Sequence, residues 1–401
     1  MTTPIDAVTL IKSIEQFLAE PSRGLDSLDK DGRHRLSEAA RKLSLVTEAD
    51  GDSVHRILHS PLELPVVMVG VQTRLFEKLV EHGKDGGTSA QLAKETSIDH
   101  ALIKRILRYY QAFGHVDQPG DDLYCANNIT EAMTTLGMRG GAPFYMGSMV
   151  PAYNALPGFL RETGYADLAD GANSPWFTGH QTKDPPFEWL PKHPELLDGF
   201  MGWMSSHHDG LPTIFDEIDF AKEIAQGADP STPVFVDMGG AMGHQCILLR
   251  QKCPSLVGRV ILQDLPPVID QVKSTPLPGF TDIEAQPHDF FKTQPLQGAR
   301  AYYLRNILHD WPDEKCVEIL KQIIPAMDES SKILLDEMVL RDRGTPWRAA
   351  ELDLSMGATC AAKERSHGQW EELLDKAGLK IERIWKYTEQ VDDCVIVAVP
   401  K

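Results

Sequence analysis

The chain lacks three kinds of sequence feature, and each absence removes a class of function. It contains no run of 18 apolar residues, so no membrane-spanning helix is expected. Its six cysteines form no C-x-x-C pair and no zinc-binding spacing, so no metal is expected. Positive charge is scarce: the chain has 40 lysines and arginines against 58 aspartates and glutamates, which gives a formal net charge of -18. That field repels phosphate and anionic lipid, so neither nucleic acid nor a membrane is expected as a partner.

The amino terminus also lacks the apolar run of a secretory signal, because Asp6, Lys12 and Glu15 interrupt it. The scattered cysteines are typical of a reducing compartment, so we expect a cytoplasmic protein. What the chain does contain is a hydrophobic fraction of 42% over 401 residues. That is enough to build the cores of more than one domain.

The first 135 residues are predicted to be mainly helical. Residues 60–83 predict one apolar helix, and Thr88 is placed to cap the next helix. A further helix is predicted over residues 99–113, followed by two short strands that flank a turn at 118–122. Helix, helix, strand, turn, strand is a winged-helix pattern. We interpret it as a dimerisation and substrate-lid module, and the acidic charge disfavours the alternative of DNA binding.

Farther along, strand-length apolar runs alternate with helices. Buried parallel strands read as such continuous runs, and the alternation predicts a doubly wound α/β sheet with right-handed crossovers. The last two runs are separated by a short polar link and predict an antiparallel edge hairpin. The runs are Pro233–Met238, Arg259–Asp264, Ala301–Ile307, Lys332–Val339, Lys380–Tyr387 and Cys394–Val399. The predicted parts are a winged-helix dimerisation domain at 1–135, a helical connector and substrate-pocket segment at 136–228, and a Rossmann-like domain with a mostly parallel seven-stranded sheet at 229–401.

A glycine-rich turn follows the first of these runs, with the sequence VDMGGAMGH over residues 236–244. Glycines let the backbone turn sharply and approach a ligand closely. Asp264 ends the next run about 25 residues beyond the loop, where nucleotide-binding folds place a carboxylate on the ribose hydroxyls. The loop, the carboxylate and the strand order together fit NAD, FAD or S-adenosylmethionine.

Residues near this loop favour S-adenosylmethionine among the three. Ala241 stands where the G-x-G-x-x-G fingerprint, counted from Gly239, requires its second glycine. Asp237 opens the loop and would meet a pyrophosphate poorly, whereas a sulfonium cofactor with an amino group tolerates a negative charge. After the third strand, Asp289 and Phe290 suit an adenine amino group and its ring, although a capping role for Asp289 fits equally well.

A histidine follows the fourth parallel run, in the segment LRNILHDWP. His309 is thereby placed at the carboxyl edge of the sheet, where such folds bind ligands. Imidazole has a suitable pKa to take a proton from a phenol or activated hydroxyl, provided that a carboxylate orients the ring. Glu337 and Glu364 come from other strand ends and are candidates for that carboxylate, and Asp310 adjoins the histidine. We interpret these four residues as a catalytic group.

These segments resemble the caffeate/flavonoid type of plant and fungal small-molecule O-methyltransferase, in its fungal secondary-metabolite branch. The matching segments are VDMGGAMGH, QDLPPVI, PHDFF, LRNILHDWPDEKC, LLDEMVL and AAKERS, and a weaker resemblance extends over most of the chain. The resemblance implies that His309 is the general base and that Glu337 and Glu364 flank and orient it. It implies that S-adenosylmethionine is contacted by Gly239, Gly240, Asp264, Leu265, Asp289, Phe290 and Arg305. It implies an acceptor pocket lined by Phe200, Met204 and Met356.

The resemblance also implies a homodimer built on the amino-terminal helices and a small hydroxyl-bearing acceptor of aromatic, polyketide or alkaloid type. Three positions depart from the usual pattern: Ala241 in the glycine loop, Ala361-Ala362 in place of two glycines, and Arg305 in place of a lysine. Some fungal members of this family catalyse dehydrations or pericyclic reactions. Because the histidine and both glutamates are retained, the sequence favours methyl transfer. A pericyclase that retains the cofactor, a winged-helix regulator and a nicotinamide dehydrogenase are the competing interpretations.

Overall fold

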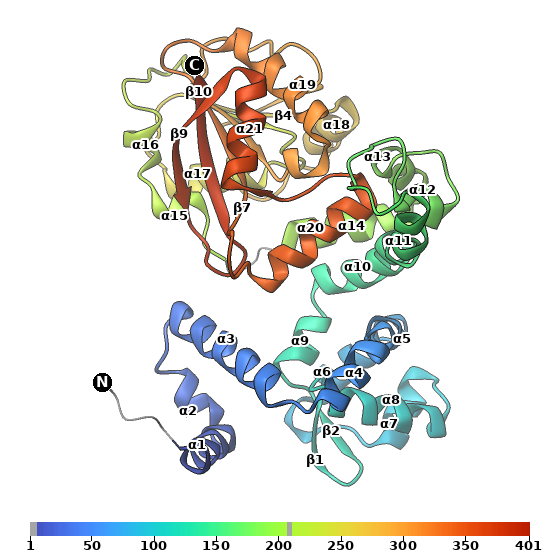
Figure 1. Ribbon diagram of the computed structural model, residues 1–401. Coiled ribbons are helices and arrows are strands. Elements are labelled where there is room, and N and C mark those ends of the chain that lie inside the picture. Colours follow the sequence, from blue (N-terminus) through green and yellow to red (C-terminus); the bar gives the residue numbers. More distant parts are fainter. Residues whose placement is uncertain (1–5, 207–210) are drawn as a thin grey trace. The chain divides into compact units, whose positions relative to one another are not determined.

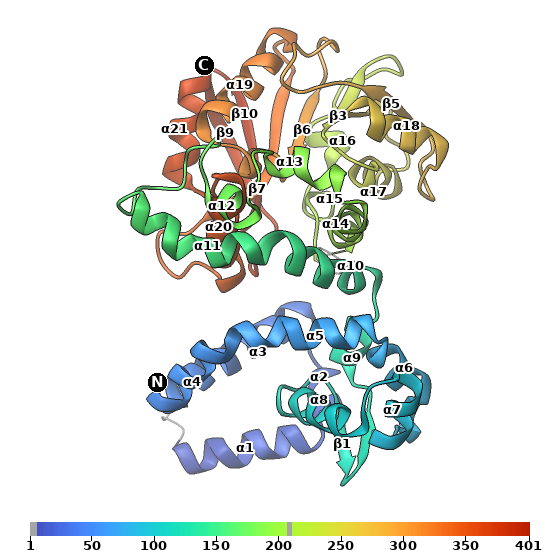
Figure 2. The same cartoon turned by 90° about the vertical axis from the view of Figure 1, so that its right-hand side faces the viewer.

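The computed structural model describes residues 6–206 and 211–401. The chain divides into two compact units, Met1–Glu63 and Leu64–Lys401. Figures 1 and 2 show that the first unit is helical and that the second contains the sheet. The predicted division at residues 135 and 228 stays a prediction. No helix in the described ranges is both long and apolar enough to cross a membrane.

The helices of the first unit begin at capping side chains and have no core of their own. Asp6 accepts a hydrogen bond from Thr9 N, and Asp29 accepts one from Gly32 N, at the starts of two of these helices. The elements are α1 (Ala7–Ala19), α2 (Pro21–Leu25), α3 (Lys30–Thr47), α4 (Asp50–His59) and η1 (Ser60–Leu62). None of the side chains described in this unit is buried. Exposed apolar residues on its helices include Val8, Ile11, Leu18, Val46, Ile57 and Leu58.

The second unit opens with the winged-helix elements predicted from the sequence. The prediction of a single helix over residues 60–83 was wrong, because Arg74 adopts a left-handed backbone with φ of 57° and breaks it into two. Thr88 caps the next helix in a capping box with Gln91, as expected. The two short strands pair antiparallel. The elements are α5 (Glu63–Gln72), α6 (Leu75–His82), η2 (Gly83–Asp85), α7 (Ser89–Thr96), α8 (His100–Ala112), β1 (Asp117–Gly120), β2 (Leu123–Cys125) and α9 (Asn128–Met133).

Two helices of the connector, α10 and α14, touch backbone to backbone along a glycine seam (Figure 2). A Cβ on Gly140 would lie 2.7 Å from Gly199 O, and a Cβ on Gly199 would lie 2.6 Å from Gly140 O. Neither position therefore accepts a side chain. The connector elements are α10 (Leu136–Phe144), the π-helix η3 (Tyr145–Met149), α11 (Val150–Glu162), α12 (Pro175–His180), α13 (Pro186–Trp189), η4 (Leu190–Lys192), α14 (Pro194–Ser206), α15 (Ile214–Glu217) and α16 (Phe220–Glu223).

The sheet confirms the predicted topology. Five parallel strands run in the order β5-β4-β3-β6-β7, and the antiparallel β10 and β9 complete a path of seven. An eighth strand, β8, pairs with β7 outside this path. The final hairpin lies at the edge, as expected. The strands are β3 (Pro233–Met238), β4 (Arg259–Asp264), β5 (Ile283–Pro287), β6 (Ala301–Arg305), β7 (Lys332–Leu340), β8 (Arg365–Ser366), β9 (Leu379–Lys386) and β10 (Asp393–Pro400).

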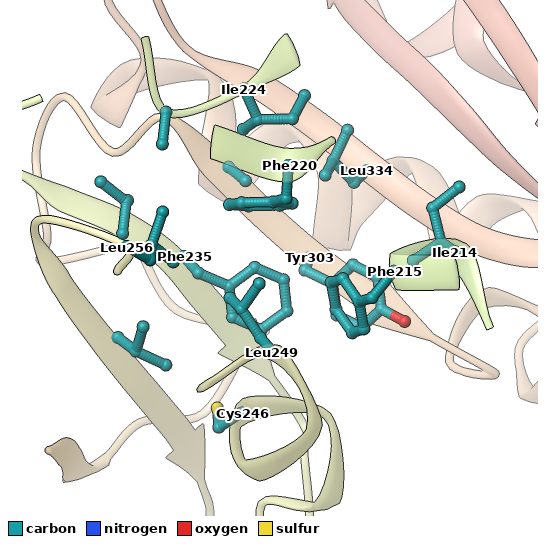
Figure 3. Close-up of a cluster of buried hydrophobic side chains, with 14 of the residues drawn as sticks. Ile214, Phe215, Phe220, Ile224, Phe235, Cys246, Leu249, Leu256, Tyr303 and Leu334 are labelled. Carbon is teal, nitrogen blue, oxygen red and sulfur yellow. The ribbon is translucent and has the colours of Figure 1, made fainter. Parts of the chain in front are cut away.

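Helices cover both faces of this sheet, and side chains alternate between them. On the first face, aromatic rings from α15, α16 and the strands pack together (Figure 3), with the Phe235 and Tyr303 ring centroids 4.8 Å apart. We call this the Phe235 face. The opposite face packs against α19 and α21, where Trp370 is fully buried. The remaining helices are α17 (His244–Lys252), α18 (Pro266–Ser274), η5 (Leu308–Asp310), α19 (Asp313–Ile323), η6 (Ile324–Ala326), α20 (Trp347–Cys360) and α21 (His367–Ala377).

Candidate active site

His309 lies in the single turn η5, just past the carboxyl end of β6. Its Nδ1 is 2.7 Å from Glu364 Oε1, and because a carboxylate only accepts, Nδ1–H is the donor. Its Nε2 lies 3.6 Å from Asp310 Oδ1 and makes no hydrogen bond within the described ranges. The side chain is largely buried, with 11% of its surface exposed. One ring nitrogen is thus held by a carboxylate, and the other is left for a ligand.

The two predicted glutamates have different contacts. Glu364 bonds to the imidazole directly, whereas Glu337 Oε1 accepts from the backbone N–H groups of Ile307 at 3.0 Å and Leu308 at 2.7 Å. Glu337 therefore holds the turn that carries His309 and makes no hydrogen bond to the ring. In both glutamates the second oxygen, Oε2, is buried without a hydrogen-bond partner.

Arg365 is a residue of this site that the sequence reasoning missed. Its fully buried guanidinium donates to Leu308 O at 3.0 Å and to Trp311 O at 3.1 Å, and it pairs with Asp313 at 2.9 Å. Arg365 thus binds carbonyl groups of the turn that carries His309, and Glu337 binds N–H groups of the same turn. The signal was present in the AAKERS segment, because an arginine next to a buried glutamate needs several acceptors.

Charges within this group oppose the ordinary effect of burial on the histidine. Burial alone would lower the pKa of His309, but Glu364, Asp310 and Glu337 outweigh it and raise that pKa to about 10. Burial raises the pKa of Glu337 to about 7 and that of Asp310 to about 6, although His309 acts to lower both. Ligand atoms of His309, Glu337 and Glu364 lie within 4.8 Å of one another, so this group is also the place where a cation would fit. The expectation of no metal stays a prediction.

The glycine turn after β3 forms a cradle with no room for side chains. A Cβ on Gly239 would lie 2.8 Å from Ile307 Cδ1, and one on Gly240 would lie 2.4 Å from Asp237 Oδ2. Ala241 adopts a left-handed backbone with φ of 49°, and Ala361 does the same with φ of 52°. Both stand at positions where the resemblance predicts glycine. Each such alanine costs about 1 kcal/mol relative to a right-handed residue. The backbone of the glycine turn therefore keeps its left-handed conformation at Ala241, and the alanine there is locally strained.

The other predicted cofactor residues surround this cradle at the same sheet edge. Asp264 accepts from Ala241 N at 2.8 Å and from Leu265 N at 2.7 Å, and burial raises its pKa. Leu265 itself is half exposed. Asp289 accepts from Phe291 N at 2.9 Å and so stabilises its own turn. No helix begins there, so the alternative that Asp289 caps a helix was wrong. A nucleoside fits an arrangement of a glycine cradle, a carboxylate and an aromatic ring, with Phe290 beside Gly239.

Two of the three predicted pocket residues lie together. Phe200 and Met356 pack in one apolar cluster, which we call the pocket cluster, whereas Met204 is 42% exposed and lies outside it. Its buried members are Phe144, Met149, Leu190, Met356 and Ala362. A polar pair borders it, since Tyr153 Oη lies 2.5 Å from Ser355 Oγ. The sequence reasoning missed this pair because its members are separated by about 200 positions along the chain.

Comparison with known proteins now identifies the family. The family model for the O-methyltransferase domain matches residues 222–380. O-methyltransferase lepI of Aspergillus flavus is 35% identical over 395 residues, which cover 98% of this chain and 99% of that protein. Demethylsterigmatocystin 6-O-methyltransferase of Aspergillus parasiticus is 34% identical, over 93% of this chain and 94% of that protein. The chain belongs to the O-methyltransferase family.

Solved structures confirm the fold and the cofactor of this O-methyltransferase family member. LepI in complex with SAM matches with a TM-score of 0.90 at 33% identity, over 99% of this chain and 100% of that one. A structure described as a pericyclic reaction enzyme matches equally well, with a TM-score of 0.90, 33% identity and coverage of 98% and 100%. OxaC in complex with sinefungin and meleagrin, at 24% identity and a TM-score of 0.82, shares the fold over 98% of this chain and 100% of that one. The cofactor is S-adenosylmethionine.

Proposed function

We propose that this enzyme transfers a methyl group from S-adenosylmethionine to a hydroxyl of a small aromatic, polyketide-type or alkaloid-type secondary metabolite. The observation that carries the proposal is the buried pair of His309 and Glu364, with Nδ1 held at 2.7 Å and Nε2 left for the acceptor. When bound, the cofactor supplies an electrophilic methyl group. Residues Gly239, Gly240, Asp264, Asp289 and Phe290 would hold it.

The residues around His309 have separate roles in proton transfer and in holding the imidazole in place. His309 Nε2 takes the proton from the acceptor hydroxyl, and Glu364 keeps the ring in the tautomer that allows this and stabilises the imidazolium that forms. Glu337 and Arg365 fix the two sides of the turn, which keeps the ring in place. Asp310, 3.6 Å from Nε2, adds negative charge where the proton arrives.

The pocket cluster supports an apolar and mostly flat acceptor. Phe144 and Phe200 meet with ring centroids 5.2 Å apart, and sulfur side chains of Met149 and Met356 lie in the same cluster. Such surfaces bind planar rings by dispersion and burial of apolar area. Tyr153 and Ser355 offer one polar contact beside it.

A second candidate function is a pericyclic or dehydration reaction in which the cofactor is retained. It is favoured by the structural match to a protein described as a pericyclic reaction enzyme. The two functions differ in the fate of the cofactor. Methyl transfer consumes it, whereas a retained cofactor leaves no S-adenosylhomocysteine.

The reaction is therefore tested by stoichiometry. The purified enzyme is screened with phenolic acceptors and methyl-labelled S-adenosylmethionine, and products are counted by mass spectrometry. We expect one S-adenosylhomocysteine and one labelled methyl ether for each acceptor converted, since the geometry provides a base for a hydroxyl. Conversion of an acceptor without S-adenosylhomocysteine would establish the second function instead.

We also propose that the enzyme is a homodimer built on its amino-terminal helices. The support is the first unit, in which no described side chain is buried and apolar residues stand exposed on α1, α3 and α4. A 63-residue unit that buries so little apolar surface needs a partner to be stable. A second copy supplies an identical set of amphipathic helices.

Light scattering during size-exclusion chromatography tests this assembly. We expect the full chain to elute as a dimer and the double substitution Ile57→Glu with Leu58→Glu to elute as a monomer, because both side chains are more than 60% exposed and apolar. Val257→Glu, at an apolar site 49% exposed in the second unit, serves as the control and should remain dimeric. A variant pair that dimerises like the parent chain would contradict the proposal.

A further inference from the structure

The carboxylate that orients the imidazole of His309 is carried by a short segment of irregular backbone. Residues 361–364 connect α20 to β8, and Glu364, at the end of this segment, is 2% exposed. The segment turns back on the helix, because Met356 O accepts hydrogen bonds from Ala361 N and, at 3.3 Å, from Ala362 N. A side chain on such backbone is placed less precisely than one on a helix or strand, unless neighbouring groups hold it.

Asp313, the first residue of α19, holds the two residues on either side of Glu364. Its Oδ2 lies 3.3 Å from Lys363 Nζ, and its Oδ1 lies 2.9 Å from Arg365 Nη2. Because α19 follows the turn that carries His309, these two ion pairs anchor the segment to the side of the base.

A second anchor comes from α20 and acts on the backbone of Glu364 directly. Asp353 Oδ1 accepts a hydrogen bond from Glu364 N at 3.0 Å. A hydrogen bond from a peptide N–H to a carboxylate is charge-assisted and directional, so it fixes the backbone from which the Glu364 side chain extends. Burial raises the pKa of Asp353, and the N–H of Glu364 opposes that shift because it stabilises the ionised carboxylate.

The helix that carries Asp353 also contributes to the pocket cluster. Met356 is a buried member of that cluster, and Leu352 packs against it. Ser355, which lies between them in the sequence, bonds to Tyr153 of α11. α20 contacts α11, α12 and η5, and Figures 1 and 2 show it between the sheet and the connector helices. One helix therefore joins the pocket cluster to the carboxylate that holds His309.

We propose that Asp353 is a positioning residue for methyl transfer, which fixes the backbone of Glu364 and ties the pair of Glu364 and His309 to the helix of the acceptor pocket. The inference rests on the proposed function, in which His309 is the base. Asp353 acts through Glu364, because its hydrogen bond is to the backbone and the imidazole bonds to the side chain. Without this anchor, the contact of 2.7 Å between Glu364 and Nδ1 is free to lengthen and the ring is free to turn.

The titration of His309 reports on this anchor without any turnover. Burial acts to lower the pKa of His309, and Glu364, Asp310 and Glu337 act to raise it. Asp310 and Glu337 lie in η5 and β7, whereas Asp353 anchors Glu364 alone among the three. A looser Glu364 should therefore lower the titration midpoint of His309.

NMR of the cofactor-free full chain with labelled histidines measures that midpoint, and the His309 signal is the one missing from His309→Gln. Asp353→Leu keeps the approximate shape of the side chain but removes the acceptor. We expect its His309 midpoint to fall by about half a pH unit or more, towards that of Glu364→Gln. Asp353→Asn keeps an oxygen that can accept from Glu364 N, so its midpoint should stay within about 0.3 pH units of the parent chain.

Kinetics should follow the same order. Asp353→Leu should lower kcat roughly 10-fold, because the base is misplaced, and Asp353→Asn should restore most of that loss. The affinity for S-adenosylmethionine should be unchanged in both, because the glycine cradle follows β3. Glu351→Gln is the matched control for the titration. It removes a negative charge from an exposed position two residues earlier on α20, which faces a different direction, and it should leave the His309 midpoint in place.

The other outcomes overturn the proposal in distinguishable ways. An unchanged His309 midpoint in Asp353→Leu, with lower thermal stability, would make Asp353 purely structural. Equal shifts in Asp353→Leu and Asp353→Asn, or a shift in Glu351→Gln, would assign the effect to charge on α20 instead of to the hydrogen bond. If Asp353→Leu does not fold, Asp353→Ala replaces it in the same comparison. Turnover that survives in His309→Gln would contradict the proposed function, and the NMR midpoints would still report whether Asp353 positions Glu364.

Discussion

Replacing His309 with glutamine is expected to lower turnover by roughly a hundredfold to ten-thousandfold, the usual contribution of a general base. Glutamine has nearly the length of histidine and still accepts or donates hydrogen bonds, but it cannot take up a proton at neutral pH. The cradle at Gly239 and Gly240 and the carboxylate of Asp264 come from other strands. The affinity for S-adenosylmethionine should therefore be retained, and calorimetry on the same preparation checks this.

A histidine outside the site supplies the control for this substitution. His367, at the start of α21, is more than half exposed, so His367→Gln should match the parent enzyme in both turnover and cofactor affinity. Near-normal turnover in His309→Gln would refute the assignment of the base. Loss of cofactor binding together with turnover would instead assign His309 a structural role in the cleft.

Replacing Glu364 with glutamine should move the pH dependence of turnover to lower pH. The negative charges around His309 raise its pKa to about 10, and Glu364 is the largest of these contributions. Without the cofactor, the fraction of unprotonated His309, and with it the rate, therefore increases with pH up to about 10. Because the positively charged cofactor lowers the pKa of His309, the rising limb of the pH–rate profile of the bound enzyme should have its midpoint between 6.5 and about 10. Without the carboxylate we expect the limb to fall by about one pH unit or more.

Asp310→Asn provides the comparison, since Asp310 is the second contributor and lies farther from the ring, at 3.6 Å. The rising limb of the pH–rate profile of Asp310→Asn should also shift to lower pH, but by a smaller amount. A limb that stays in place in Glu364→Gln would show that the kinetic pKa belongs to a group other than His309. The limb should also vanish in His309→Gln, which ties the titration to the ring.

The same pair makes a prediction about stability, with a definite sign. A histidine whose pKa is raised in the folded state binds its proton more tightly there, so the pair stabilises the fold fully below the unfolded pKa of about 6.5. That contribution is lost as the pH rises through about 10. The difference in unfolding free energy between the parent enzyme and Glu364→Gln should shrink over this window, which denaturant titrations at several pH values measure.

Much of the catalytic half could be predicted from the sequence because its signals are local. β3 and β4 begin and end at the predicted residues, because buried parallel strands are uninterrupted apolar runs bounded by polar positions. The position of His309 follows from the same logic, since a residue just past a parallel strand has to lie at the carboxyl edge. Thr88 was predictable as a helix start because a capping box is encoded within four residues.

What could not be predicted depends on contacts between distant segments. The break at Arg74 comes from a single left-handed residue, and no glycine or proline stands at the break itself, since the nearest glycine, Gly70, lies inside α5. The different contacts of Glu337 and Glu364 depend on where the fold places them: Glu337 lies within β7 and reaches the backbone of Ile307 and Leu308, whereas Glu364 directly precedes β8 and reaches the imidazole of His309. The local sequence around each glutamate does not indicate these partners. Asp336 could not be singled out in the sequence, because its hydrogen-bond donors are distant along the chain: Tyr303 lies in β6 and Tyr387 lies just past β9.

The glycine seam between α10 and α14 has a consequence for how this chain could be altered around the pocket cluster. Phe144 on α10 and Phe200 on α14 both face the pocket cluster, and their helices already touch backbone to backbone. The spacing of this wall therefore cannot be tuned, because a single added methyl group at Gly140 or Gly199 pushes both helices apart. Substitutions that preserve this contact are therefore those of side chains that project from the two helices, such as Phe144 and Phe200.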